Sequence, residues 1–247
     1  MAIKKTKAFS IKSTDYRESD SIVTLYGKNE GKFSAMAKGA RKTDSKFGSV
    51  FDLLSLSEII YYEGSKLDFV SDGDLIEGWD RLRRRRNLIQ AGLESAQLIN
   101  LLIEEGQREE GLFGLFYRTL KALNEDPPEG KVVEIGFYLK TLKLIGIPPI
   151  LERCGICGSK AEEIDRPFFS PKSGGMICKD CSGDLEKAKK IGKRLSRTLK
   201  ALTKLPQKKT GRLKMKKEDI EESFRLLDLY TTYHMRPDHS GPLVSRL

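Results

Sequence analysis

Four cysteines in two CxxC pairs place the strongest constraint on how this chain can fold. CGIC supplies Cys154 and Cys157, and CKDC supplies Cys178 and Cys181, with 20 residues between the pairs. Two such pairs are typical of a structural zinc site, in which four thiolates fill the tetrahedral positions and leave none open for chemistry. We therefore predict that residues from about 152 to 183 fold as a module around one structural Zn²⁺ ion.

Disulfide bonds and a redox-active CxxC are the two alternatives for these cysteines. A cytosolic chain disfavours persistent disulfides, and a thioredoxin-like site needs one CxxC that opens a helix rather than two matched pairs. Zinc is therefore the preferred interpretation. The sequence PKSGG at Pro171–Gly175 predicts a hairpin between the two pairs.

The first 80 residues predict strands, because short β-rich or alternating runs are separated by turn signals such as GKNEGK and EGSK. The predicted strands are Thr6–Ile11, Ile22–Tyr26, Lys32–Ala37, Leu54–Tyr62 and Leu67–Asp72. With no long helix between them, five strands favour a small antiparallel barrel or sandwich. A five-stranded Greek-key barrel of the oligonucleotide-binding (OB) type fits this count, although strand number alone does not choose between topologies.

After Trp79 the hydrophobic period becomes helical. The predicted helical segments are Leu88–Ile103, Leu112–Leu123, Val132–Ile145, Ile191–Leu202 and Glu218–Tyr233. The predicted fold is therefore multidomain α+β: an OB-type barrel at residues 1–80, then a helical domain at residues 81–247 into which the zinc module is inserted.

The net charge of +10 is unevenly distributed along the chain. Met1–Asp80 holds 12 Lys/Arg against 13 Asp/Glu, whereas Lys187–Lys217 holds 14 Lys/Arg and no carboxylate. This asymmetry favours a polyanionic partner, first nucleic acid and second a membrane surface, with a merely solvated basic face as the alternative. No apolar run is long enough to cross a bilayer, and the first residues lack the apolar part of a secretory signal, so we expect a cytoplasmic protein with no membrane partner.

Three basic segments are candidates for phosphate contacts: the strand and loop Glu30–Phe47, the arginine-rich DRLRRRRN from Asp80, and Lys187–Lys217. The predicted contact residues are Lys32, Lys38, Gly39, Arg41, Lys42, Lys46, Arg83, Arg84, Arg86, Lys193 and Arg197. In the first segment, Gly39 lets a phosphate approach the backbone while its neighbours supply charge, and protection of a sheet edge is the alternative. For the arginines, pairing with Glu77 and Asp80 is an equal alternative to phosphate binding.

Sequence motifs of enzymes are missing. The only two histidines, His234 and His239, do not form an HExxH motif, and GKNEGKF has Phe33 where a P-loop needs Ser or Thr. The GxSxG and GxGxxG patterns are also absent. We therefore expect a protein that binds without catalysis.

Several of these segments occur together in one known family. They are STDYRESDSIVTLYGKNEGKFSAMAKGARKTDSKFGSVFDLLSLSEIIYYEG near the start, then LFGLFYRTLKAL, LKLIGIPPILERCGICG, FFSPKSGGMICKDC and TTYHMRPDHSGPLVS in the same order. Over nearly its whole length, the chain resembles the bacterial RecO family of recombination mediators and DNA repair proteins.

This resemblance implies an OB-type barrel, a helical domain and a Zn²⁺ module. It also implies binding to single- and double-stranded DNA, annealing of complementary strands, and association with the nucleoid during repair. With RecR, such a protein helps to load RecA onto strands coated by single-stranded-DNA-binding protein (SSB), whose C-terminal tail docks on the helical domain. A zinc-stabilised RNA-binding or ribosome-associated protein is the alternative from another class, and a protein–protein adaptor is a third.

Overall fold

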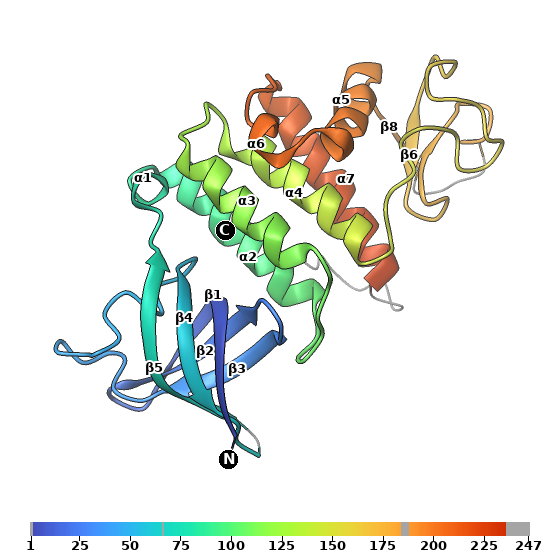
Figure 1. Ribbon diagram of the computed structural model, residues 1–247. Coiled ribbons are helices and arrows are strands. Elements are labelled where there is room, and N and C mark those ends of the chain that lie inside the picture. Colours follow the sequence, from blue (N-terminus) through green and yellow to red (C-terminus); the bar gives the residue numbers. More distant parts are fainter. Residues whose placement is uncertain (1, 66, 184–187, 236–247) are drawn as a thin grey trace. The chain divides into compact units, whose positions relative to one another are not determined.

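The computed structural model describes residues 2–65, 67–183 and 188–235 and forms two compact units, Met1–Asp126 and Pro127–Leu247 (Figure 1). Lys187, His239 and the rest of the predicted family segment after Met235 lie outside the described residues. The division into domains at residue 80 stays a prediction.

The first unit contains a closed barrel with strand order β1-β2-β3-β5-β4. Its strands are β1 Ile3–Tyr16, β2 Asp20–Gly27, β3 Gly31–Ala37, β4 Leu56–Tyr62 and β5 Asp68–Glu77. All neighbouring pairs are antiparallel except β3 and β5, which pair in parallel and close the barrel. The predicted five-stranded OB-type barrel is thus confirmed.

Alternation along the strands explains the barrel core. In β3, Phe33, Ala35 and Ala37 are buried while Ser34 and Met36 are only half-buried, because successive side chains point to opposite faces. Phe33 stacks on Tyr61 of β4 inside the barrel, with ring centroids 5.1 Å apart.

Three helices complete the first unit: α1 Asp80–Arg83, α2 Arg86–Leu102 and α3 Leu112–Asn124. Aromatic contacts join them to the barrel, because Phe9 of β1 packs against Phe113 and Phe116 of α3 at centroid distances of 4.9 and 4.8 Å. The buried indole of Trp79 donates a hydrogen bond to the Leu54 carbonyl at 2.9 Å. The barrel wall next to α2 and α3 is therefore covered by protein.

The second unit is built around α4 Gly130–Leu144, which packs against α5 Lys193–Lys204, α6 Gln207–Thr210 and α7 Lys217–Met235. Tyr138 of α4 donates its hydroxyl to Thr231 and Asp228 of α7 at 3.0 and 3.2 Å. A small sheet of β6 Phe168–Ser170, β7 Gly175–Ile177 and β8 Lys189–Lys190, in the order β7-β6-β8, belongs to the cysteine-bearing module. The predicted hairpin over PKSGG joins β6 and β7 and is confirmed.

Some element boundaries differ from the prediction. β1 and β5 are longer than predicted because their ends pair with neighbouring strands although most of the side chains there are exposed, including the apolar Ile3, Leu75 and Ile76. β4 starts at Leu56 rather than Leu54, since Leu54 has the left-handed φ of +73° that breaks a strand. α1 and α6 have four residues each, too few to show a helical period in the sequence.

Candidate metal centre and nucleic-acid contacts

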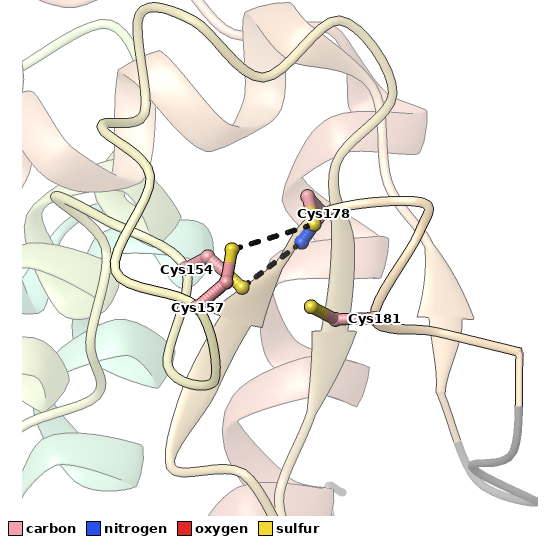
Figure 2. A group of neighbouring side chains, drawn as sticks. All are labelled: Cys154, Cys157, Cys178 and Cys181. Carbon is pink, nitrogen blue, oxygen red and sulfur yellow. Dashed lines mark hydrogen bonds between the residues drawn. The ribbon is translucent and has the colours of Figure 1, made fainter.

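The four cysteines come together in the second unit, as Figure 2 shows. Their sulfur atoms all lie within 4.8 Å of one another, and the sulfurs of Cys157 and Cys178 are 3.8 Å apart. A tetrahedral ion with metal–sulfur bonds of about 2.3 Å places its sulfurs about 3.8 Å from one another. The cluster therefore has the size of a four-thiolate metal site, and it can hold a metal ion.

Backbone hydrogen bonds hold the two cysteine pairs in place. The Cys154 amide donates to the Ser159 carbonyl at 2.7 Å, which closes the turn of the first pair. The Cys178 amide, at the end of β7, donates to the Cys154 sulfur at 3.4 Å. Beneath them Cys154, Ile164, Met176 and Ile177 form a small buried core. The positions of the ligands thus follow from the fold of the module.

The thiols differ in acidity. A hydrogen bond with the Ser159 hydroxyl, 3.2 Å from the sulfur, lowers the pKa of Cys157 to about 6. The hydrogen bond with Cys178, followed by burial, raises the pKa of Cys181 to about 12. One thiol is thus ready to ionise near neutral pH, but four neighbouring thiols do not all ionise unaided. A divalent cation supplies the compensating charge, and its binding releases protons.

The predicted glycine-centred loop follows β3 in the first unit. Gly39 adopts φ +69° and donates its amide to an Asp20 carboxylate oxygen at 2.8 Å. A side chain at this position would meet only the Lys42 methylenes, at 3.6 Å or more. The glycine is therefore needed for the backbone conformation, and the space beside it is open except for the Lys42 side chain.

The five predicted side-chain cations in and around this loop have different surroundings. Arg41 pairs with Asp15 at 3.1 Å, Lys46 donates to the Ser71 carbonyl, and Lys32 donates to the Asn100 carbonyl of α2 at 2.9 Å. Burial lowers the pKa of Lys32. The Lys42 side chain is exposed, and its ammonium has no hydrogen-bond or ion-pair partner in the described part of the chain. Lys42 is thus the cation of this group best placed for a ligand.

An apolar stripe, formed by Ile3, Tyr62, Phe69, Met36 and Ile22, runs around the outside of the barrel across its five strands. These residues are direct cross-strand partners, from β1 through β4, β5 and β3 to β2. Ile3 is 64% exposed and the other four are half-buried. We call these five residues the outer stripe. It places two aromatic rings side by side on a barrel surface.

The Lys38 ammonium borders the outer stripe, 5.7 Å from the centre of the Phe69 ring. The barrel aromatic side chains Phe33, Phe47 and Tyr61 are buried in the core and cannot stack on a base. Tyr62 remains available and Phe69 joins it. The sequence reasoning missed Phe69, although the buried neighbour Val70 could have indicated that Phe69 faces outward.

The arginine-rich segment divides into fixed and exposed residues. Arg83 donates to the carbonyls of Gly78 and Leu53 at 2.6 and 2.9 Å and to the Ser55 hydroxyl at 3.1 Å, so it fastens α1 to the barrel. Its partners are neither of the two predicted carboxylates. Arg84 and Arg86 are exposed, and no ion pair joins them to a carboxylate of the described residues.

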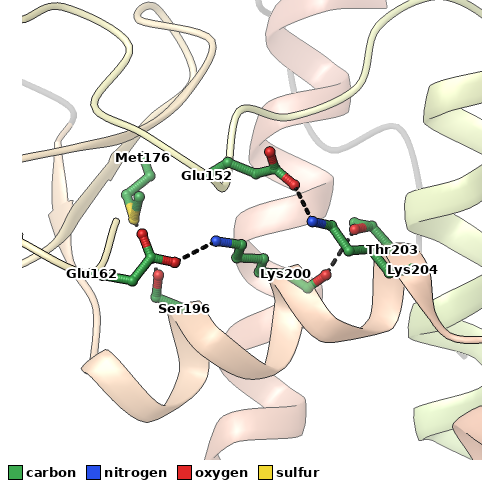
Figure 3. Close-up of polar contacts among 7 residues, drawn as sticks. All are labelled: Glu152, Glu162, Met176, Ser196, Lys200, Thr203 and Lys204. Carbon is green, nitrogen blue, oxygen red and sulfur yellow. Dashed lines mark hydrogen bonds and ion pairs between the residues drawn. The ribbon is translucent and has the colours of Figure 1, made fainter. Parts of the chain in front are cut away.

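Carboxylates neutralise most of the cations on α5. Lys193 pairs with Asp165 at 2.5 Å, and Arg194 pairs with Asp219. Figure 3 shows Lys200 paired with Glu162 at 2.6 Å and Lys204 paired with Glu152 at 2.7 Å. Of the two residues predicted here, Lys193 is therefore paired, whereas Arg197 is exposed.

The second unit also contains a groove of about 760 Å³ between α4, the segment 148–153 and the end of α5. Pro148 and Ile150 supply apolar surface, and Lys143 and Arg153 supply positive charge at exposed positions. None of the helices in the described ranges combines the length and apolar character that crossing a bilayer requires.

Comparison with known proteins covers both units. A family model described as "Recombination protein O N terminal" matches residues 1–79, and one described as "Recombination protein O C terminal" matches residues 91–241. The chain is 26% identical to "DNA repair protein RecO" of Caldanaerobacter subterraneus, covering 96% of this chain and 95% of that protein. It is 30% identical to "DNA repair protein RecO" of Pelotomaculum thermopropionicum, covering 96% and 91%. Since the two family models together span most of the sequence, the chain belongs to the RecO family.

Proposed function

We propose that this protein binds single- and double-stranded DNA in recombinational repair and does so without catalysing a reaction. Membership of the RecO family supports the role in repair. The closed OB-type barrel supports nucleic-acid binding, because barrels of this architecture bind oligonucleotides on their outer strand faces and loops.

The observation that carries this proposal is the outer stripe with its flanking cations. Tyr62 and Phe69 are opposite each other on β4 and β5, and the Lys38 ammonium lies over the Phe69 ring, 5.7 Å from its centre. Lys42 adds a cation without a partner on the adjoining loop. Aromatic rings on which bases stack, next to ammonium groups that neutralise phosphates, are the two components of sequence-independent single-strand binding.

We also propose that the protein anneals complementary strands and, with RecR, helps to load RecA onto SSB-coated DNA. Annealing needs no reacting group, since neutralising phosphates is enough to let two polyanions approach. The groove in the second unit suits the C-terminal tail of SSB, because its apolar walls can take side chains and Lys143 or Arg153 can pair with the terminal carboxylate.

The cysteine module is proposed to hold Zn²⁺ in a structural role. Four sulfur donors in a compact tetrahedral cluster suit zinc, and they leave no open position for a reacting ligand. When bound, the ion supplies charge compensation for the thiolates and links the two cysteine pairs. The residues Cys154, Cys157, Cys178 and Cys181 would be its ligands.

The proposal can be tested with Phe69→Ala and Phe69→Tyr in the full chain. We expect the alanine variant to lose about 5- to 150-fold in affinity for a single-stranded oligonucleotide, since stacking contributes about 1–3 kcal/mol per base. The tyrosine variant keeps a ring and should retain affinity.

A second pair of variants tests the contribution of the cations, with one variant serving as the control. Lys42→Ala should make the salt dependence of binding shallower by about 0.7 on single strands. Lys5→Ala, which removes a cation already paired with Glu58 at 2.8 Å, should not. The repair function would be contradicted if the wild-type protein does not bind DNA at low salt. It would also be contradicted if the protein binds structured RNA as tightly as DNA or more tightly.

A further inference from the structure

The segment Gln207–Lys217 of the second unit carries a concentration of unpaired positive charge. We call this segment the α6 segment. It contains six cations and no carboxylate: Lys208, Lys209, Arg212, Lys214, Lys216 and Lys217. All six side chains are exposed, and none forms an ion pair with a carboxylate of the described residues.

Buried contacts fix the backbone beneath these cations. The Gln207 side chain is 3% exposed; it donates to the Val133 carbonyl at 2.8 Å and accepts from the Lys140 ammonium at 2.7 Å. The fully buried Thr210 donates its hydroxyl to the Gln207 carbonyl at 2.7 Å. Gly211 is also buried, and a side chain there would come within 2.7 Å of Pro127.

This anchoring sets the direction of the charged side chains. Because Gln207, Thr210 and Gly211 face α4, the intervening Lys208 and Lys209 and the following Arg212 face solvent. The three cations are therefore held on a rigid backbone, which lowers the entropy lost when they meet a ligand.

Helix α5 differs from the α6 segment in that most of its cations are paired with carboxylates. On α5, four cations each have a carboxylate partner, supplied by the module or by α7. The α6 segment follows α5 after two residues, yet no carboxylate of the described ranges pairs with its cations. Six like charges in eleven residues repel one another, and an external polyanion would relieve this repulsion.

The surroundings favour nucleic acid as that polyanion. Amphipathic helical peptides and membrane-inserting helices need an exposed apolar surface beside the charge. Leu213 and Met215 are only half-exposed, and none of the large exposed apolar side chains of the described residues lies in the α6 segment. A phosphate backbone needs only the cations.

We propose that the α6 segment is a phosphate-binding surface that holds a nucleic-acid strand by its backbone, in addition to the barrel surface. This inference rests on the proposed DNA-binding function and deepens it by giving the second unit its own strand contact. A chain with one contact surface in each unit can hold two short strands at once.

The test compares two triple variants of the full chain that remove the same charges. The first is Lys208→Ala, Lys209→Ala and Arg212→Ala, in the α6 segment. The matched control is Arg194→Ala, Lys200→Ala and Lys204→Ala, whose cations are all paired on α5. Melting temperatures establish that both variants fold.

Binding of a fluorescent oligothymidine is then measured across a salt series from about 50 to 200 mM. Loss of three phosphate contacts makes the slope of log affinity against log salt shallower by about 2. Raising the salt across this range should therefore weaken binding by the α6 variant about 20-fold less than it weakens binding by wild type. The control should keep the wild-type slope. With short oligothymidine in excess, wild type should bind two molecules and the α6 variant one.

The outcomes separate the two proposals. Wild-type protein that binds no DNA refutes the proposed function itself. Wild-type binding with the α6 variant unchanged, or with both variants weakened equally, refutes only this inference. If the α6 variant keeps the wild-type salt dependence of DNA binding but loses binding to polyglutamate, an acidic protein is the ligand. That result would also overturn this inference.

Discussion

Removal of the metal should increase the salt dependence of DNA binding, because the cysteine module neutralises one side of α5. Glu152, Glu162 and Asp165 pair with Lys204, Lys200 and Lys193 respectively. All three carboxylates lie in or next to the module, as Figure 3 shows for two of the pairs. If the module unfolds, the three carboxylates leave fixed positions and the three lysines become available to phosphates.

We expect the module to depend on a bound metal ion, because its own core is too small to fold it. Among the described residues, four buried side chains form that core, Cys154, Ile164, Met176 and Ile177, with a few partly buried ones such as Phe168 packed against them. Units of this size usually need a metal or disulfides. Structural zinc supplies about 10–16 kcal/mol in isolated zinc-binding peptides near pH 7. Chelation should therefore unfold the module, while Tyr138 still ties α4 to Thr231 of α7.

The expected magnitude follows from three cations. On single strands each phosphate contact contributes about 0.7 to the slope of log affinity against log salt, so chelator should steepen the slope by up to about 2. The assay is the same oligothymidine titration with and without chelator, followed by return of Zn²⁺. Cys178→Ser should reproduce the effect of chelator and should not respond to added Zn²⁺.

The pH of the assay matters because the three carboxylates titrate. Hydrogen bonds from their lysine partners lower the pKa of Glu152, Glu162 and Asp165. Since each folded-state pKa lies below the unfolded value, the stabilisation is complete above the ordinary carboxyl pKa and is lost as the pH falls through the folded value. At pH 7 the ion pairs are thus fully formed. An unchanged slope and melting temperature after metal removal at this pH would refute the reasoning.

Two further variants test the barrel and the groove. Gly31 has φ +73°, and a side chain there would lie 2.0 Å from the Gln107 carbonyl oxygen, so Gly31→Ala should destabilise the protein by more than about 3 kcal/mol in urea unfolding. Gly106 has a similar φ, but a side chain there would meet no other atom within 4 Å, so Gly106→Ala should lower the free energy of unfolding by only about 1 kcal/mol. Equal destabilisation by the two substitutions would contradict this reasoning. Lys143→Glu in the groove should weaken binding of an SSB tail peptide about tenfold, whereas Lys121→Glu on α3 should not, and equal binding by both would exclude the groove.

Local patterns predicted the features that depend on residues close in sequence. The cysteine spacing indicated the cluster because each CxxC turn brings its two sulfurs together within a few residues. Alternation indicated the barrel core, since burial on one face of β3 requires apolar residues at every second position. The ends of β1 and β5 were missed because their side chains are mostly exposed, with Leu75 and Ile76 adjacent in β5, so no apolar–polar alternation marks them.

Long-range pairing could not be predicted from the same patterns. Lys193 meets Asp165 across 28 residues of sequence, and Lys200 meets Glu162 across 38. Composition therefore described Lys187–Lys217 as one uniform basic block, whereas the structure divides its described part into a mostly paired half and an unpaired half. Lys32 shows the same limit, because its Asn100 partner lies 68 residues away on α2.

This division changes what a count of positive charges can mean for binding. A cation that already has a carboxylate at 2.5–2.7 Å must give up that partner to gain a phosphate, so the net gain in counterion release is small. A cation on the α6 segment gives up only water and salt ions. Affinity for a polyanion should therefore follow the number of unpaired cations, and the α6 segment, although shorter than α5, should contribute more to it.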